Sequence, residues 1–318
     1  MERVLITGGA GFIGSHLAEA LIAAGREVWV LDDLSTGALA NLAGIAPQSR
    51  FHFRQGSVTD PAAVTRAVAE VDYVYHLAAA VGVELVVRRP VYTIEDNVRG
   101  TENVLAAAAE RGTGVLLTST SEVYGKSERE RFGEEDDLLI GPPTASRWSY
   151  ACSKLLDEFL ALAYHREQGL PVIVTRLFNT VGPRQTGRYG MVLPRLLGQA
   201  VRGEPLTIHG DGKQTRCFCH VRDVVRALVE LPGYPAAAGQ VFNVGSNEEV
   251  SIAQLAQRVK AVVGSRSELR LVPYAAGLED MRRRVPDTGK LTALTGWTPT
   301  QTLAEILREM VADKNLAF

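Results

Sequence analysis

A glycine-rich turn between an apolar run and an apolar helix pattern limits the possible folds of this chain more than any other feature. Gly8, Gly11 and Gly14 follow the apolar run at residues 4–7, and a helix pattern covers residues 12–24. The first glycine permits a tight turn, the second lets the backbone approach a phosphate, and the third lets helix and strand pack closely. The helix N-terminus then offers free N–H groups to an anion. We therefore expect a turn that binds a dinucleotide pyrophosphate.

A carboxylate at the end of the next apolar run indicates which dinucleotide is bound. The run at residues 28–32 ends at Asp32, which lies 18 residues after Gly14. At about this distance a carboxylate accepts hydrogen bonds from the adenosine ribose hydroxyls, and it would repel a 2′-phosphate. We therefore expect NAD rather than NADP as the cofactor.

Apolar runs and helix patterns alternate along the chain. This alternation is typical of an α/β fold with a doubly wound parallel sheet, the Rossmann arrangement. We expect strands at residues 4–7, 28–32, 51–53, 71–78, 114–119 and 171–177, and helices at about 12–24, 61–70, 94–111 and 150–168. Turn residues become frequent after Asn179, and further helices are expected at about 191–202, 222–231, 251–263 and 302–313.

The change in pattern divides the chain into two parts. We expect a NAD-binding Rossmann domain at residues 1–177 and a smaller C-terminal lobe for the substrate at residues 178–318. A segment at about 213–245 should return to the first domain, because the run at residues 240–244 has the character of another sheet strand.

Charge, apolar runs and cysteine content indicate which partners and which cellular compartment to expect. The 318 residues carry 34 basic and 36 acidic side chains, and a net charge of −2 favours neither nucleic acid nor a membrane surface as partner. No apolar run approaches the ~18 residues that span a bilayer, and the first strand leaves no room for a signal peptide. Three cysteines do not make a disulfide framework, so we expect a cytoplasmic protein. Cys217 and Cys219 alternate with Phe218 as in a strand, and no second ligand cluster accompanies them, so we expect no metal site.

Tyr150 and Lys154 form the candidate acid/base pair. They are four residues apart, so their side chains lie on one helix face. A free tyrosine has a pKa of about 10. An ammonium close by, together with a positive nicotinamide ring, would favour the phenolate. The phenolate could then take a proton from a sugar hydroxyl while hydride leaves for NAD.

A third catalytic element is expected where the strand at residues 114–119 ends. Strand ends at the carboxyl edge of such a sheet face the ligand crevice. Thr120 could relay a proton between the substrate hydroxyl and Tyr150. Glu122 adds a second acid/base group, which a simple alcohol oxidation does not need.

Together these features resemble the extended short-chain dehydrogenase/reductases of the nucleotide-sugar epimerase/dehydratase family. The resemblance spans nearly the whole chain, and it rests on residues 7–14, 76–79, Asn97, Tyr150 with Lys154, 176–179 and 182–184. It implies that NAD stays bound, oxidises the sugar at C4 and is regenerated in the same turnover. The implied cofactor contacts are Gly8, Gly11, Phe12, Ile13, Gly14, Asp32, Ser57, Ala78, Asn97, Tyr150 and Lys154. Ser57 stands where the family usually has Asp.

Narrower features resemble the UDP-glucuronate decarboxylases within that family. The Thr-Ser-Glu at residues 120–122, the stretch before Tyr150, and residues 213–218 and 284–287 are similar to segments of such decarboxylases and related enzymes. Residues 80–83 differ, because decarboxylases that form UDP-xylose usually carry Ser-Pro there.

This resemblance implies a decarboxylation mechanism for UDP-glucuronate. Oxidation at C4 would turn the C5 carboxylate into a β-keto acid, and loss of carbon dioxide would leave an enolate that hydrogen bonds can stabilise. Glu122 would manage the proton at C5. Arg284 and Arg147 would orient the carboxylate. The UDP contacts are expected from Arg216 and Asn179 at the diphosphate and Thr207 at the uracil.

Three other readings remain open at this point. A UDP-sugar 4-epimerase needs the same tyrosine, threonine and NAD, and a sugar-nucleotide 4,6-dehydratase shares them too. A non-catalytic, NAD-loaded sensor is the alternative outside enzymes, although it would have no need of the Tyr150–Lys154 couple. The resemblance also implies a homodimer joined through the helices near residues 94–111 and 150–168.

Overall fold

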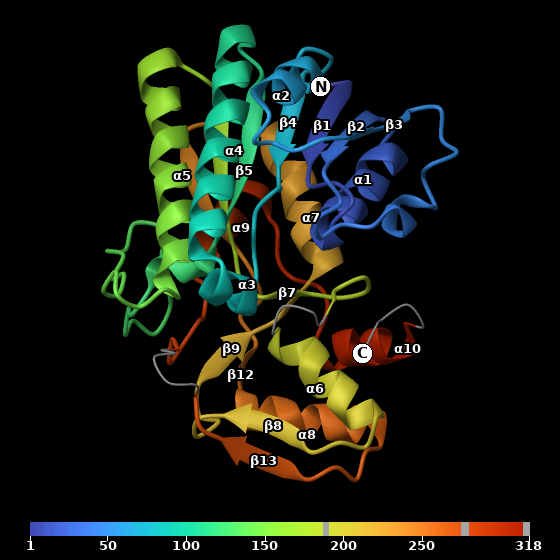
Figure 1. Ribbon diagram of the computed structural model, residues 1–318, viewed down its shortest axis with the longest axis vertical. Coiled ribbons are helices and arrows are strands. Elements are labelled where there is room, and N and C mark those ends of the chain that lie inside the picture. Colours follow the sequence, from blue (N-terminus) through green and yellow to red (C-terminus); the bar gives the residue numbers. More distant parts are fainter. Residues whose placement is uncertain (187–190, 275–279, 314–318) are drawn as a thin grey trace.

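A seven-stranded parallel sheet forms the frame of the molecule (Figure 1). The computed structural model describes residues 1–186, 191–274 and 280–313. Across the sheet the strands follow the order β3-β2-β1-β4-β5-β6-β11. They are β1 (Arg3–Thr7), β2 (Glu27–Asp32), β3 (Phe51–Gln55), β4 (Tyr73–His76), β5 (Gly114–Thr120), β6 (Val172–Leu177) and β11 (Gln240–Val244). The predicted doubly wound sheet is confirmed, and the run at residues 240–244 pairs with β6 as expected.

Helices cover both faces of this sheet. Val4 and Ile6 of β1 pack into one apolar core and Leu5 packs into the other, as alternation along a strand requires. The first core takes in α1 (Phe12–Ala23), α7 (Val221–Glu230) and α9 (Gly289–Thr295), and the second takes in α2 (Pro61–Val68), α4 (Pro90–Arg111) and α5 (Trp148–Gln168). No helix in the described ranges is both long and apolar enough to cross a bilayer.

A smaller lobe with its own core lies beyond the carboxyl ends of the strands (Figure 1). Its helices are α6 (Val192–Val201), α8 (Ile252–Val263) and α10 (Leu303–Ala312). Short strand pairs complete it: β8 (Leu206–His209) with β13 (Leu269–Val272), and β9 (Thr215–Cys217) with β12 (Glu249–Ser251). β7 (Thr180–Val181) pairs with β10 (Cys219–His220) where the chain passes between the lobes.

The chain crosses from one core to the other within two residues. Phe218 packs into the core of the smaller lobe, and Cys219 packs into the core around α1 and α7. Burial raises the pKa of Cys217 to about 12, so this thiol stays protonated at neutral pH. Within the described ranges, no three His, Cys, Asp or Glu side chains are grouped as a metal ion requires.

Two elements depart from the sequence-based expectation. α4 begins at Pro90 rather than near residue 94, because a proline without an N–H fits the first turn of a helix. A short helix, α3 (Val83–Arg88), precedes it and was not predicted. Between β1 and β4 the strand order reverses direction, and in such sheets the ligand crevice opens at that point.

Candidate active site

A cleft of about 1100 Å³ opens at the carboxyl edge of the sheet. Its walls come from the ends of β1, β4, β5 and β6, from α3 and the start of α4, and from the smaller lobe. The cleft exceeds the volume of a typical small-molecule site, which matches a dinucleotide and a second ligand bound together.

The glycine turn has the geometry that its sequence predicts. Gly8 adopts a φ of +71°, which favours glycine, and the N–H of Gly11 donates to its carbonyl oxygen at 3.1 Å. A side chain at Gly14 would collide with the same carbonyl oxygen, so only glycine lets α1 pack this close. All three glycines, with Phe12 and Ile13, line the cleft. The turn therefore presents backbone and a helix N-terminus to a ligand, which fits a pyrophosphate.

Asp32 is fixed at the cleft wall by backbone groups. Its Oδ2 accepts from the N–H of Ala10 at 2.9 Å, and its Oδ1 accepts from the N–H of Leu34 at 2.8 Å. Burial raises the pKa of the Asp32 carboxyl, and the two N–H donors oppose that shift. A carboxylate held this way is placed for the ribose role that the sequence predicts.

The remaining predicted cofactor residues fall in two groups. Ser57 and Ala78 line the cleft. Asn97 is buried and is not among the lining residues. Its Oδ1 accepts from the N–H of Ala80 at 2.7 Å, and its Nδ2 donates to the Ser153 hydroxyl at 3.0 Å. Asn97 thus holds the loop after β4 against α5. It lies behind the cleft wall and does not form part of the cleft surface as its predicted role required.

Tyr150, Thr120 and Glu122 meet at the floor of the cleft. The Thr120 hydroxyl accepts from the N–H of Glu122 at 3.2 Å and hydrogen-bonds the Tyr150 phenol. Burial raises the pKa of Tyr150 above its ordinary value, and the charges of Glu122 and Asp157 raise it further. The hydrogen bond from Thr120 and the charge of Arg284 oppose this shift.

Lys154 forms an ion pair on the helix that carries Tyr150. Its Nζ donates to Asp157 Oδ2 at 2.8 Å, and both side chains are almost fully buried. The charge of Arg284, from the smaller lobe, also lowers the pKa of Tyr150. Asp157 comes three residues after Lys154 on the same helix face, and the predicted effect of Lys154 on the phenol stays a prediction.

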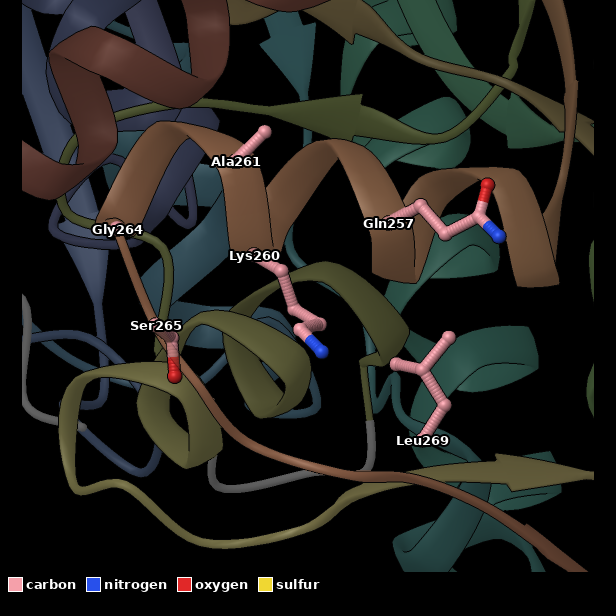
Figure 2. A pocket seen from close by; sticks show the side chains of 6 residues that line it. All are labelled: Gln257, Lys260, Ala261, Gly264, Ser265 and Leu269. Carbon is pink, nitrogen blue, oxygen red and sulfur yellow. The ribbon is translucent and has the colours of Figure 1, made fainter.

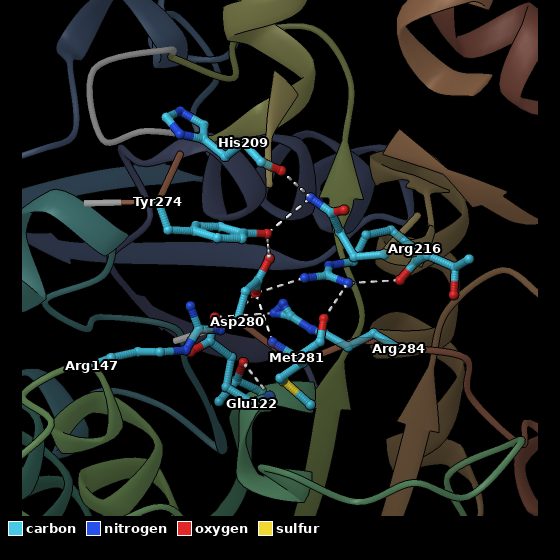
Figure 3. Close-up of polar contacts among 11 residues, drawn as sticks. Glu122, Arg147, His209, Arg216, Tyr274, Asp280, Met281 and Arg284 are labelled. Atoms are coloured by element: carbon cyan, nitrogen blue, oxygen red, sulfur yellow. Dashed lines mark hydrogen bonds and ion pairs between the residues drawn. The ribbon is translucent and has the colours of Figure 1, made fainter. Parts of the chain in front are cut away.

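A cluster of ion pairs joins the two lobes within the cleft (Figure 3). Arg284 donates to Glu122 Oε1 at 3.0 Å. Asp280 Oδ1 receives Arg216 at 2.7 Å and Arg147 at 3.3 Å. Burial lowers the pKa of Arg216 to about 10, although Asp280 opposes this. Three arginines predicted to bind substrate thus converge in the cleft, two of them on one carboxylate.

Comparison with known proteins shows to which family this fold belongs. Residues 4–245 match the model of the "NAD dependent epimerase/dehydratase family". The chain belongs to this family. The resemblance found in the sequence is confirmed, and the protein is an enzyme of the epimerase/dehydratase family, a family described as NAD dependent.

Two curated relatives of this epimerase/dehydratase are decarboxylases. The chain is 40% identical over 323 residues to "UDP-N-acetyl-alpha-D-glucosaminuronate decarboxylase" of Bacillus cytotoxicus, covering 98% of this chain and 97% of the relative. It is 39% identical over 311 residues to "UDP-glucuronic acid decarboxylase 1" of Arabidopsis thaliana, covering 98% of this chain and 69% of the relative.

Solved structures of the same architecture include other reactions. A dTDP-glucose 4,6-dehydratase from Streptomyces venezuelae with NAD bound superimposes with a TM-score of 0.90 at 31% identity, covering 98% of this chain and 96% of that one. A UDP-glucose 4-epimerase from Thermotoga maritima with UDP-glucose gives 0.89 at 30% identity, covering 98% and 97%. The fold therefore identifies the epimerase/dehydratase family without separating the reactions within it.

Among the residues predicted to contact UDP in this epimerase/dehydratase, some line the cleft and one does not. Asn179 lines the cleft, and its Nδ2 donates to the carbonyl of Cys217 at 2.8 Å. Thr207 does not line the cleft, because its hydroxyl is taken up by Gln199 at 2.9 Å and by Arg195. Arg195 lines the cleft instead, and the sequence gave no signal for it.

A second hollow lies away from the cleft, between α8 and the segment that leads into β13 (Figure 2). Lys260 is the charged side chain among the residues that line it: Gln257, Lys260, Ala261, Gly264, Ser265 and Leu269. A lone lysine beside an amide and a hydroxyl makes no acid/base set, so we assign no chemistry to this hollow.

Proposed function

We propose that this enzyme binds NAD and decarboxylates UDP-glucuronate to UDP-xylose. The observation that carries the proposal is the ion pair between Glu122 and Arg284, which stands beside Tyr150 and Thr120 in the cleft. Oxidation of a hydroxyl needs only the tyrosine and its hydrogen-bond partner. A carboxylate and an arginine at the same place suit a substrate that carries its own carboxylate and must be protonated at carbon.

The glycine turn and Asp32 are the residues that would hold NAD. The fit rests on Gly11, where an added Cβ would meet the carbonyl oxygen of Gly8 at 3.2 Å, and on the buried carboxylate beside the turn. When bound, NAD supplies the hydride acceptor for oxidation at C4 and the hydride donor for the later reduction. The three cysteines are free thiols, and we infer a reducing, cytoplasmic setting.

The side chains then have distinct roles in the reaction. Tyr150 takes the proton of the C4 hydroxyl as the C4 carbon is oxidised, and Thr120 holds the oxygen in line. The resulting ketone makes the C5 carboxylate a β-keto acid, so the bond to carbon dioxide breaks and its electrons pass to the C4 oxygen. Tyr150 and Thr120 donate hydrogen bonds to that enolate oxygen. Glu122 guides the proton that C5 receives, before C4 is reduced again.

The arginines provide the contacts for the charged parts of the substrate. Arg284 lies beside Glu122 and is placed to orient the carboxylate that is lost. Arg216 and Arg147 share Asp280, and they suit the diphosphate and the sugar end of a UDP-uronate. Guanidinium groups bind both phosphate and carboxylate through two parallel hydrogen bonds.

A second substrate deserves a direct test because of one relative. The Bacillus cytotoxicus protein is named for a uronate with an N-acetyl group, and it matches this chain over nearly its whole length. Purified enzyme should therefore be given UDP-glucuronate, UDP-N-acetylglucosaminuronate and UDP-glucose in parallel. We expect carbon dioxide and UDP-xylose from the first. Carbon dioxide from the second alone would move the substrate to the N-acetyl sugar, and inversion of UDP-glucose without carbon dioxide would make the enzyme a 4-epimerase.

We also propose a homodimer. α4 and α5 pack side by side at one side of the sheet (Figure 1). Their outer surface leaves Val91 68%, Ile94 42%, Leu156 52% and Phe159 60% exposed. Large apolar side chains gathered in this way favour contact with another protein surface, and the same face of a second copy would bury them in a four-helix bundle.

A further inference from the structure

A buried ion pair lies behind the cleft, and the proposed reaction makes no use of it. Glu158 on α5 and Arg176 on β6 are 3% and 6% exposed, and neither is among the described residues that line the cleft. The carboxylate of Glu158 accepts from Arg176 Nε at 3.0 Å and from Nη2 at 2.8 Å. Burying two charges costs free energy, and apolar side chains of similar volume often stabilise a protein as well as such a pair does. The contacts that this pair makes with other segments are therefore more informative than the pair itself.

The pair holds both ends of the segment that carries Glu122. The Ser119 hydroxyl donates to Glu158 Oε1, and Arg176 Nη1 donates to the Tyr124 hydroxyl at 3.0 Å. Glu122 lies between these two anchors, in a short 3₁₀ helix that ends at Tyr124. One buried pair thus fixes the backbone on both sides of Glu122.

The same hydrogen bonds continue to the segment that carries Arg284. The Tyr124 hydroxyl donates to Asn243 Oδ1 at 2.7 Å, and Asn243 Nδ2 donates to the carbonyl of Asp287 at 3.1 Å and of Phe132 at 2.8 Å. The N–H of Asp287 donates to the same Phe132 carbonyl at 2.9 Å. Burial raises the pKa of Tyr124 to about 12, so the phenol keeps the proton that it donates. Asp287 comes three residues after Arg284, so this segment is fixed as well.

The network therefore reaches both partners of the ion pair between Glu122 and Arg284, which are 162 residues apart in the sequence. We propose that Tyr124 and Arg176 are positioning residues that align the Glu122 carboxylate with Arg284. The proposal rests on the proposed function, because that ion pair is the observation that carries it. Neither positioning residue lines the cleft, so both act through the segments that they hold.

Thr120 depends less on this network than Glu122 does. It is the last residue of β5 and pairs with Leu177 of β6, so the ladder of the parallel sheet keeps it in place. Loss of the network should therefore displace Glu122 and spare the oxidation step, which requires Tyr150 and Thr120.

The test is the ratio of carbon dioxide release to NAD reduction in a single turnover with UDP-glucuronate. Tyr124→Phe removes only the hydroxyl that joins Arg176 to Asn243, and the ring can keep its contact with Phe132. We expect NAD reduction to stay within about 3-fold of the wild-type rate and carbon dioxide release to slow by about 10- to 100-fold, because a displacement of about 1 Å can cost that much. An unchanged ratio would overturn the proposal, as would an equal loss of both rates.

A second variant and a matched control separate positioning from general stability. Arg176→Lys keeps a positive charge beside Glu158, but a single ammonium cannot reproduce the fork that reaches both Glu158 and Tyr124, so the ratio should fall here too. Asp223→Asn is the control, because it weakens buried hydrogen bonds between α7 and the segment before α10, and Asp223 does not line the cleft. It should lower the melting temperature and leave the ratio unchanged. A similar fall of the ratio in Asp223→Asn would refute a specific role for the network.

A second measurement needs no substrate. A double-mutant cycle compares the change in melting temperature that Glu122→Gln causes in the NAD-loaded wild type and in NAD-loaded Tyr124→Phe. If Tyr124 aligns Glu122 with Arg284, the change should be smaller in Tyr124→Phe, and in Asp223→Asn it should equal that in the wild type. Equal changes in the wild type and in Tyr124→Phe would refute the alignment. If no UDP-sugar is decarboxylated, the proposed function fails, while this cycle still decides the role of Tyr124.

Discussion

In the proposed mechanism Tyr150 and Glu122 are two acid/base groups with separate tasks, and single substitutions can separate them. Both line the cleft, and both lie within the influence of Arg284. The motif around Tyr150 was visible in the sequence, as was the unusual Glu122. Asp157 and Asp280 were not singled out. Asp280 meets Arg147 and Arg216 only through the fold, whereas Asp157 lies three residues after Lys154 and only its burial was hidden in the sequence.

Tyr150→Phe should stop oxidation at C4. The change removes only the hydroxyl, so the fold should persist, and the rate of NAD reduction should fall by about 10²–10⁴-fold. The measurement is NADH absorbance after mixing with UDP-glucuronate. A loss of less than about 10-fold would assign the proton transfer to another residue.

Glu122→Gln should separate oxidation from decarboxylation. Glutamine keeps the size of the side chain and cannot carry a proton, so NADH should still form while carbon dioxide release slows by about 10²–10⁴-fold. Trapped carbon dioxide and NADH absorbance, followed in the same sample, give both rates. Release of carbon dioxide at the full rate would remove Glu122 from the mechanism.

At the scale of elements, the positions of the strands and long helices can be predicted from the periodicity of apolar residues. The residues at which these elements begin and end depend on local contacts. The six expected strands and the helices near 12–24 and 150–168 appear within a few residues of the predicted bounds. α3 is only six residues long and too short to show a helical period, so the sequence gave no signal for it. Thr207 lies on β8, which was not predicted, and its side chain turns toward Gln199 and Arg195 of α6 and not into the cleft.

Asp223 ties α7 to the segment before α10, and this tie should be pH dependent. Its carboxylate accepts from Thr300 N and Oγ1 at 2.9 and 2.8 Å and from Gln301 N at 3.1 Å. These hydrogen bonds lower the pKa of Asp223, although burial opposes them. A depressed carboxylate pKa stabilises the fold above its unfolded value near 3.8, and this contribution is lost as pH falls through the folded pKa.

Asp223→Asn should therefore lower the melting temperature by a few degrees at pH 7. As pH falls through the lowered pKa of folded Asp223, the wild type should lose the same stabilisation, so the two melting temperatures should converge. Calorimetry at several pH values makes the comparison. A difference that is independent of pH would mean that the charge of Asp223 does not contribute.

At the scale of the whole molecule, the two lobes are interleaved in sequence. β11, α7 and α9 belong to the core beside the sheet although they follow α6, which belongs to the smaller lobe. Repeated crossing of this kind leaves no single point at which the sequence changes character. A boundary in the sequence could therefore only be drawn approximately.

The exposed face of α4 and α5 makes a prediction about assembly. Phe159→Glu places a charge in the centre of the proposed dimer contact and should yield monomers of 34.4 kDa in sedimentation at micromolar concentration. Leu271→Glu is the control, because Leu271 is 63% exposed on β13, away from that face. A wild-type protein that sediments as a monomer would rule out the dimer.

The shared carboxylate of Asp280 turns ligand entry into an exchange of anions. Arg147 and Arg216 both contact its Oδ1, and the Tyr274 hydroxyl donates to Oδ2 at 3.3 Å. An incoming anion has to outcompete a tethered one, so chloride or a single carboxylate gains little by approaching. A diphosphate brings enough charge and enough oxygen atoms to take over both guanidinium groups. If the proposed function holds, we expect the cleft to favour a diphosphate over smaller anions before any sugar reaches Tyr150.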